Sequence, residues 1–198
     1  MKLAALFSGG KDSTYAIHLA KKHGHSVDVL LTIFPHNDES HLLHYPNIRF
    51  TSLQSESMKI PQLTEQLTST ETKNESEALD RLILSAKENY SIDGIVHGGI
   101  LSQYQKDNFS SSCKKNNLEI ISPLWNTEPE SYMKELLSEN FQYIISTVSS
   151  DGLNDYWLGR TIQENDLIEL KKLQEKYDFN LNFEGGEAET FVTNCPLF

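Results

Sequence analysis

The sequence predicts an α/β fold, in which a parallel sheet carries helices on both faces and a smaller α/β subdomain follows at the C-terminus. Two apolar runs, residues 3–7 and 27–34, are typical of buried strands, and residues 14–22 between them have helical spacing of apolar side chains. A strand–helix–strand unit of this kind forms a parallel pair with a right-handed crossover. Ligands bind such sheets beyond the carboxyl ends of the strands, where residues 8–13 fall.

That loop reads Ser8-Gly9-Gly10-Lys11-Asp12-Ser13 and has the composition of a phosphate-binding turn. Glycines let successive N–H groups point into one concavity, serines add hydroxyl donors, and the following helix contributes its positive N-terminal end. Lys11 supplies a cation for a phosphate oxygen. Asp12 beside phosphates indicates a bridging Mg²⁺, or else it is a helix cap. A glycine turn without a ligand is the third interpretation.

Residues 35–46 form a polar stretch with three histidines, His36, His41 and His44. No acidic or thiolate partner stands at a recognised ligand spacing, so we expect a loop that partly covers the ligand rather than a zinc site. Cys113 and Cys195 are far apart and outside any Cys-x-x-Cys pattern. We therefore expect both to be reduced, packed thiols.

Residues 1–122 are expected to form a nucleotide-binding domain, in which strands and helices continue to alternate after the first unit. Thr72 and Glu75 form a capping-box pattern ahead of a helix at about 73–89. The pair Gly98-Gly99 follows a buried strand at the same sheet edge, where it either contacts the nucleotide or a second substrate or is a simple loop. The other expected elements are strands at 48–53, 62–69 and 94–96 and a short helix at 55–60, and an apolar stretch at 120–125 is expected to end this domain.

Residues 123–198 are expected to form the C-terminal, substrate-recognition subdomain. Apolar spacing predicts a helix at 129–138 and a strand at 141–148. A turn at 149–152 and an irregular or briefly helical segment at 153–160 follow. A capping-box pattern at Thr161 and Glu164 is expected to open the last helix.

The stretch Glu184-Gly185-Gly186-Glu187-Ala188-Glu189-Thr190 gathers three carboxylates around a glycine pair. Carboxylates held this close together need cations, a metal or water around them. A solvated acidic turn and a site for Mg²⁺ or a cationic substrate group both stay open from the residues alone.

Composition excludes several functional classes. The net charge is −11 and no basic run occurs, which argues against binding to a nucleic-acid backbone. No stretch approaches the roughly 18 apolar residues of a membrane span. The chain enters its first strand at once, without the pattern of a signal peptide, so we expect a cytoplasmic protein. A homo-oligomer is compatible with the sequence.

The loop at residues 8–13 resembles the PP-loop of the ATP pyrophosphatases, which split ATP between the α- and β-phosphates to adenylate a substrate. A more specific resemblance covers the whole chain. Residues 98–106, Pro123-Leu124-Trp125, Leu158-Gly159-Arg160 and residues 184–192 occur in an order similar to that of the diphthine–ammonia ligase family, in its compact archaeal form. The resemblance implies a Rossmann-like sheet of the HUP type.

The resemblance also implies a reaction. ATP activates the carboxylate of diphthine, a modified histidine of translation elongation factor 2, and free ammonium supplies the amide nitrogen. It implies ATP and Mg²⁺ as cofactors, with Lys11, Asp12 and Glu187 as catalytic residues and Asp12 as the metal ligand. The implied nucleotide-binding residues are Ser8, Gly9, Gly10, Lys11, Asp12, Ser13, Gly98 and Gly99. The implied substrate-binding residues are Ser102, Tyr104, Gln105, Glu184, Gly185, Gly186, Glu187, Glu189 and Thr190.

Diphthine carries a trimethylammonium group, which the acidic loop or an aromatic ring such as Tyr104 or Trp157 is expected to recognise. Two positions depart from the family pattern, Asn108 where an arginine is common and Ala188 where an aromatic is common. The alternatives are another PP-loop adenylating enzyme, acting in tRNA modification or sulfur transfer, and an ATP-binding sensor without turnover. Missing cysteine pairs and the negative charge weigh against the first.

Overall fold

The computed structural model describes residues 1–35, 47–67 and 72–198, apart from the side chains of residues 72, 73 and 104. The elements in chain order are β1 (Lys2–Leu6), α1 (Lys11–Lys22), β2 (Ser26–Phe34), η1 (Ile48–Phe50), α2 (Thr51–Met58), β3 (Gln62–Gln66), α3 (Thr72–Tyr90), β4 (Gly94–Val96), α4 (Gln103–Lys115), β5 (Glu119–Ile121), α5 (Pro129–Ser138), β6 (Gln142–Val148), η2 (Asp155–Trp157), α6 (Glu164–Tyr177) and β7 (Ala188–Asn194).

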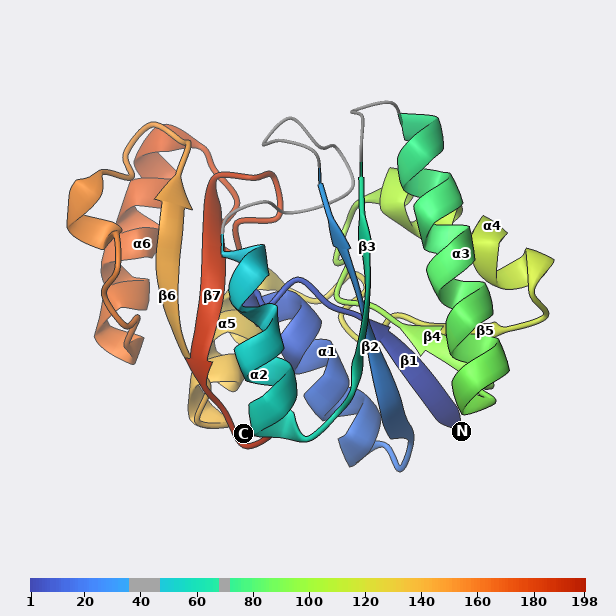
Figure 1. Cartoon of the computed structure of the whole chain (residues 1–198). Helices are drawn as coiled ribbons and strands as arrows, with labels where there is room; N and C mark the ends of the chain where they lie inside the picture. Colours follow the sequence, from blue (N-terminus) through green and yellow to red (C-terminus); the bar gives the residue numbers. More distant parts are fainter. Residues whose placement is uncertain (36–46, 68–71) are drawn as a thin grey trace.

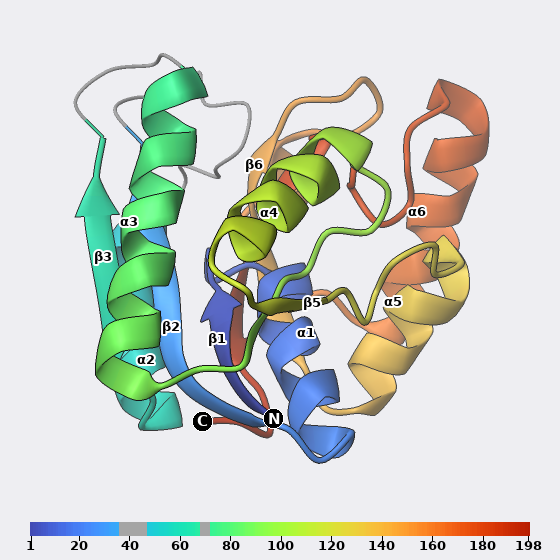
Figure 2. The same cartoon turned by 90° about the vertical axis from the view of Figure 1, so that its right-hand side faces the viewer.

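Five strands form a parallel sheet in the order β3-β2-β1-β4-β5. Helices α3 and α4 cover one face and α1 and α2 the other, so the expected α/β sheet is confirmed (Figures 1 and 2). Each face of the sheet has its own apolar core, because successive side chains of a buried strand point to opposite faces. In β1, Ala4 packs under α3, whereas Leu3 and Ala5 pack under α1.

The C-terminal part is a smaller α/β unit that packs against α1. Strands β6 and β7 pair antiparallel, and α5 and α6 lie beside them (Figure 1). Its apolar core surrounds Trp157 and Tyr143 and also includes Tyr15 of α1. The two parts of the chain thus share one core across α1. The boundary at residue 122 stays a prediction.

The segment at 48–53 is not a strand, and the predicted helix at 55–60 is shifted toward the N-terminus. Residues 48–58 form η1 and α2, and the side chains at positions 48, 51, 54, 55 and 58 are buried. That spacing is helical. Three of those buried residues, Thr51, Gln54 and Ser55, are polar, while Leu53 is 59% exposed, so the apolar pattern pointed to the wrong structure.

Two predictions for the C-terminal part are wrong as well. Helix α6 begins at Glu164, not after a cap at Thr161, and the Asp166 carboxylate accepts the N–H of Gln163. The acidic stretch at residues 184–190 is not a turn throughout, because its last three residues, from Ala188 on, form the start of β7. The prediction for helix α5 is confirmed at both ends, residues 129 and 138. At its N-terminus the Glu128 side chain caps the first turn and Pro129 begins the helix.

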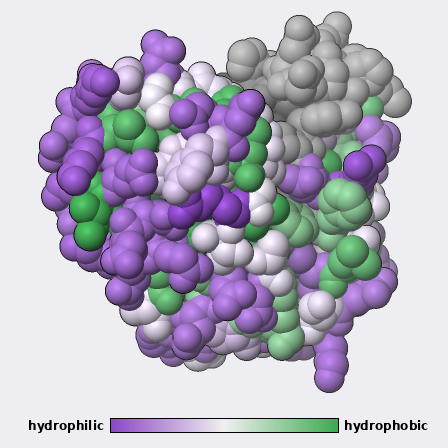
Figure 3. All heavy atoms as spheres, turned by 90° about the vertical axis from the view of Figure 1, so that its left-hand side faces the viewer, coloured by the Kyte–Doolittle hydropathy of each residue, from purple (hydrophilic) through white to green (hydrophobic). Residues whose placement is uncertain are grey.

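No helix in the described part of the chain is long and apolar enough to span a membrane. Hydrophilic side chains cover most of the face on the α6 side, with apolar ones scattered among them (Figure 3). His36, His41 and His44 lie outside the described residues, as does the side chain of Thr72 in the expected capping box.

Candidate active site

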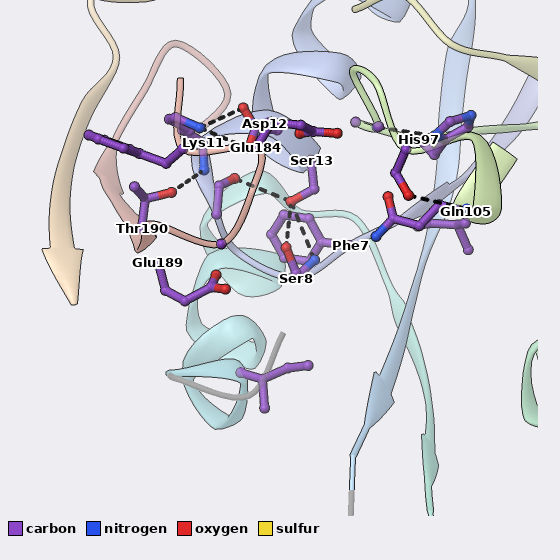
Figure 4. A pocket seen from close by; sticks show the side chains of 18 of the residues that line it. Phe7, Ser8, Lys11, Asp12, Ser13, His97, Gln105, Glu184, Glu189 and Thr190 are labelled. Carbon is purple, nitrogen blue, oxygen red and sulfur yellow. Dashed lines mark hydrogen bonds and ion pairs between the residues drawn. The ribbon is translucent and has the colours of Figure 1, made fainter. Parts of the chain in front are cut away.

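A cavity of about 620 Å³ lies beyond the carboxyl ends of β1, β2 and β4. The C-terminal part closes its other side, through residues just before and within β7. Figure 4 shows the side chains of the labelled residues of the loop at 8–13 together with Glu184 and Thr190, and those of His97 and Gln105 on the other side of the view. The lining residues are Leu6, Phe7, Ser8, Gly10, Lys11, Asp12, Ser13, Leu31, Ile33, Ile48, Glu75, Leu79, His97, Gly98, Gly99, Ser102, Gln105, Phe109, Thr147, Ser149, Phe183, Glu184, Gly185, Gly186, Ala188, Glu189 and Thr190.

The loop at residues 8–13, here called the phosphate loop, depends on Gly9 for its shape. Gly9 has φ +79°, and a Cβ there would lie 2.5 Å from Oε1 of Gln54. Its carbonyl accepts the N–H of Val192 at 3.0 Å and the amide of Gln54 at 3.1 Å. The same Gln54 nitrogen donates to the Val192 carbonyl at 2.8 Å. One buried amide therefore joins the phosphate loop to β7.

The start of α1 is arranged to receive an anion. The N-cap residue, Gly10, has no side chain that could cap the first turn. The Ser13 hydroxyl lies 3.2 Å from the Ser8 hydroxyl and accepts the Ser8 N–H at 3.3 Å. The Thr190 hydroxyl of β7 accepts the Lys11 N–H at 3.2 Å. Hydroxyl groups and a helix N-terminus thus converge on one wall of the cavity.

Lys11 and Asp12 form an ion pair at the base of this wall. Lys11 is 1% exposed, and its Nζ lies 2.8 and 2.9 Å from the two Asp12 oxygens. The ammonium also donates to the Asn182 carbonyl at 2.6 Å. Tyr132 of α5 donates its hydroxyl to Asp12 Oδ1 at 2.6 Å. The phosphate contact expected of Lys11 stays a prediction, since its ammonium is engaged with Asp12 and Asn182 here.

Gly98 and Gly99 have different surroundings. A Cβ on Gly98 would lie 2.5 Å from the backbone carbon of Asp12, so this residue lets the turn after β4 pack against the first turn of α1. The Gly99 N–H donates to Nδ1 of His97 at 3.1 Å. The other ring nitrogen of His97 therefore carries the proton and donates to the Ser122 hydroxyl at 2.6 Å. Both glycines line the cavity.

His97 is neutral because of where it lies. The ring is 2% exposed and packs edge-on against Phe109. Burial, together with the charge of Lys106, lowers its pKa to about 4. At ordinary pH the imidazole therefore joins the glycine turn to Ser122 by two neutral hydrogen bonds, one to each.

The carboxylates of the acidic stretch play different roles. Glu184 lines the cavity, and its Oε1 accepts the N–H groups of Ile100 at 3.1 Å and Leu101 at 3.0 Å, just before α4. Glu187 turns back onto its own loop and accepts the backbone N–H groups of Asn180 and Gly185, each at 2.8 Å. Its expected catalytic role stays a prediction. The Glu189 side chain lies on the cavity side of β7 near Ser8 (Figure 4).

The structure brings together most of the residues expected at the site. Ser102 caps α4 by accepting the Gln105 N–H, and both residues line the cavity. The side chain of Tyr104 lies outside the described part. Trp157 is 1% exposed in the C-terminal core, so its expected contact with a cationic substrate group is wrong. No sequence pattern points to the contacts of Gln54, Tyr132 or Asn182, because their partners lie far away along the chain. His97 is also unpredicted, although one of its partners, Gly99, is only two residues away.

Two family profiles match the chain. The diphthamide synthase N-terminal domain matches residues 1–120 and the diphthamide synthase C-terminal domain matches residues 128–198. The chain belongs to the diphthamide synthase family.

Curated members of the diphthamide synthase family align with the whole chain. Diphthine–ammonia ligase of Homo sapiens is 34% identical over 100% of this chain and 80% of its own length, and that of Danio rerio is 30% identical over 100% and 84%. Among solved structures, a predicted subunit of a tRNA methyltransferase from Methanocaldococcus jannaschii aligns with a TM-score of 0.45 at 17% identity, over 98% of each chain.

Asn108 and Ala188 stand where the family resemblance predicts an arginine and an aromatic residue. Asn108 lies on α4, and its Oδ1 is 3.5 Å from the Ser76 hydroxyl of α3. Ala188 is 4% exposed, begins β7 and pairs with Val148. In this member of the family, the first position therefore faces the neighbouring helix α3, and the second packs in the core beside the cavity.

Proposed function

We propose that the chain is an ATP-dependent diphthine–ammonia ligase, which amidates diphthine on elongation factor 2. Membership of the diphthamide synthase family supports this function. The single observation that carries it in the structure is the cavity itself, where the phosphate loop, the acidic stretch and the turn after β4 come together. Its volume of about 620 Å³ suits a nucleotide together with a small second reactant.

The reaction has two steps. In the first, the diphthine carboxylate attacks the α-phosphorus of ATP, forms an acyl-adenylate and releases pyrophosphate. In the second, ammonia attacks the acyl carbon and AMP leaves, which yields the amide. The first step turns a poor leaving group into a good one, and the chain's task is to hold the phosphates in line and stabilise the departing charge.

The N–H groups of the phosphate loop, the hydroxyls of Ser8 and Ser13 and the N-terminus of α1 are proposed to bind the phosphates. The apolar wall formed by Leu31, Ile33 and Leu79 is proposed to exclude water from the nucleotide. Ser102 and Gln105, on the opposite wall, are proposed to contact the protein substrate.

Asp12 is proposed to hold Mg²⁺ together with the phosphates. The described residues contain no cluster of three or more His, Cys, Asp or Glu that could hold a metal ion. The Asp12 carboxylate, which lines the cavity, nevertheless fits Mg²⁺, because Mg²⁺ commonly uses one or two carboxylates and completes its shell with phosphates and water. When bound, the cation neutralises the charge of the pyrophosphate leaving group.

Free ammonium is proposed as the nitrogen source. Hydrolysis of glutamine would need a reactive thiolate. Cys113 and Cys195 are buried, and burial raises the pKa of each thiol to about 11. Both cysteines are therefore protonated at neutral pH and unsuited to that role.

The trimethylammonium group of diphthine is proposed to lie near Glu184 and Glu189. Both residues line the cavity, whereas the Glu187 carboxylate is bound to its own loop. Carboxylates in a partly enclosed site attract a quaternary cation without needing hydrogen-bond donors from it.

The test is an amidation assay with diphthine-bearing elongation factor 2, ATP and ammonium. We expect amide, AMP and pyrophosphate in equal amounts, all dependent on the modified factor. A tRNA-modifying adenylase would release AMP with tRNA instead, and a sensor would bind ATP without releasing pyrophosphate. Product formation with glutamine alone, in ammonium-free buffer, would contradict the proposed nitrogen source.

A further inference from the structure

The C-terminal part of the chain contacts the Asp12 carboxylate directly through Tyr132 and indirectly through Asn182, which bonds Lys11. The Tyr132 hydroxyl donates to Oδ1 at 2.6 Å, and the ammonium of Lys11 contacts both carboxylate oxygens. The Asn182 carbonyl accepts from that ammonium at 2.6 Å. Tyr132 and Asn182 do not line the cavity, whereas Asp12 does. The Tyr132 hydroxyl therefore reaches Asp12 from the protein side, whereas Lys11 itself lines the cavity.

The burial of these groups gives the contact a fixed geometry. Tyr132 is 2% exposed and lies in the core shared by α1 and the C-terminal part. A ring packed in this way cannot easily rotate or shift, so its hydroxyl stays in one place and favours one position of the Asp12 Oδ1 atom. Burial and the adjacent Asp12 carboxylate raise the pKa of Tyr132 well above its ordinary value, so the hydroxyl remains a donor.

A carboxylate that binds a cation gains affinity when neighbouring groups already hold it in the binding orientation. Without a second contact, an aspartate at the first turn of a helix rotates about two side-chain bonds. The buried ammonium of Lys11, itself held by the Asn182 carbonyl, supplies one such contact. Tyr132 supplies a contact from a rigid neighbour in another part of the chain.

We propose that Tyr132 is a positioning residue for the divalent cation of the nucleotide complex. It orients Asp12, so α5 contributes to the metal affinity of the phosphate loop although it does not touch the cavity. This inference rests on the proposed Mg²⁺–ATP chemistry and deepens it. It also gives the C-terminal part a role in nucleotide binding beyond contact with the protein substrate.

The test compares Tyr132→Phe with Tyr143→Phe in the full-length chain. Tyr143 is a matched control, because it is fully buried in the same core and its hydroxyl has no hydrogen-bond partner among the described residues. The readout is the dissociation constant of Mn²⁺, followed by electron paramagnetic resonance with saturating α,β-methylene-ATP. Thermal unfolding of both variants measures their stability.

We expect Tyr132→Phe to weaken Mn²⁺ binding about tenfold, the loss of one hydrogen bond to a charged group. Tyr143→Phe should leave Mn²⁺ binding unchanged. The Mg²⁺ concentration for half-maximal activity should rise with Tyr132→Phe, while the KM for the modified factor stays the same. Tyr132→Met, which also lacks the hydroxyl and keeps an apolar side chain, should give the same loss if the phenylalanine variant fails to fold.

Equal Mn²⁺ affinities in the two phenylalanine variants would overturn the inference, whatever their stabilities. So would a parent chain that binds the nucleotide without Mn²⁺. The proposed function fails in a different way: the parent chain would bind Mn²⁺ with the nucleotide but would not amidate the factor. The two failures are therefore distinguishable.

Discussion

Replacement of Gln54 by leucine should loosen the phosphate loop without touching any ligand. The Gln54 side chain is 3% exposed and does not line the cavity. Its amide nitrogen donates to the carbonyls of Gly9 and Val192. Leucine has similar volume and no donor, so the packing survives while both bonds are lost.

The loss of stability depends on which hydrogen-bond partner each of the two carbonyls keeps after the substitution. The Gly9 oxygen keeps the N–H of Val192, whereas the Val192 oxygen loses its Gln54 partner and is left buried. A buried acceptor without a partner costs about 1–3 kcal/mol, so we expect the free energy of unfolding to fall by about 2 kcal/mol. In a chain of this size that lowers Tm by about 4–8 °C. Binding of ATP should weaken as well, because the Gly9 peptide is no longer held in one orientation.

The assay is chemical denaturation followed by tryptophan fluorescence, together with titration of α,β-methylene-ATP. Gln142→Leu is the matched control, since Gln142 is an exposed glutamine on β6. A loss of stability in Gln54→Leu no larger than in Gln142→Leu would refute the reasoning. Loss of stability with full nucleotide affinity would refute the functional part alone.

Three further predictions concern the neighbouring segments. Gly98→Ala should destabilise the chain by about 1–3 kcal/mol in thermal unfolding, because its methyl would meet backbone atoms of α1 at 2.5–2.6 Å. Gly99→Ala should cost less, because its methyl would meet side-chain atoms alone among its nearest neighbours, the His97 ring at 3.0 Å and Gln105 Oε1 at 3.5 Å. Glu187→Gln should lower the free energy of unfolding by about 1–2 kcal/mol in urea, because an amide NH₂ would face the N–H of Gly185 or Asn180; an unchanged midpoint would argue against the loop-closing role. His97 is protonated below a pKa of 6.5 in the unfolded chain but only below a pKa of about 4 in the folded chain. As the pH is lowered from 6.5 to 4, the free energy of unfolding should therefore decrease, by up to about 1.4 kcal/mol per pH unit. His97→Asn, compared with the parent by denaturation at each pH, should remove that part of the slope.

The sequence predicts well those elements that are determined by residues close to one another in the chain. The strand before the phosphate loop, the glycines within it and the helix after it are specified by neighbouring residues. Helix α5 was predicted at both ends because Pro129 and the apolar spacing act locally. The acidic stretch was likewise found from its composition alone.

Segments whose buried positions are polar defeat the same approach. Helix α2 buries Thr51, Gln54 and Ser55 because their side chains bond backbone carbonyls: Thr51 and Ser55 those of nearby residues, Gln54 that of Val192 on β7. Polar side chains buried in this way leave no apolar pattern, and the partner of Gln54 is brought near only by the fold. Tyr132 looked like one more apolar residue of α5, and only the contact with Asp12 reveals its second role. Strand β7 was missed because its acidic first residues resemble the loop that precedes it.

The phosphate loop is built by both parts of the chain. The Gly9 carbonyl accepts the N–H of Val192, the Lys11 N–H donates to the Thr190 hydroxyl, and Tyr132 holds Asp12. Thr190 and Val192 lie on β7, which continues directly from the acidic stretch. A substrate that shifts this stretch must also shift the bonds that shape the loop, and a nucleotide that stiffens the loop must stiffen the stretch. Because coupling between two sites is reciprocal, ATP and the modified factor should each alter the binding of the other.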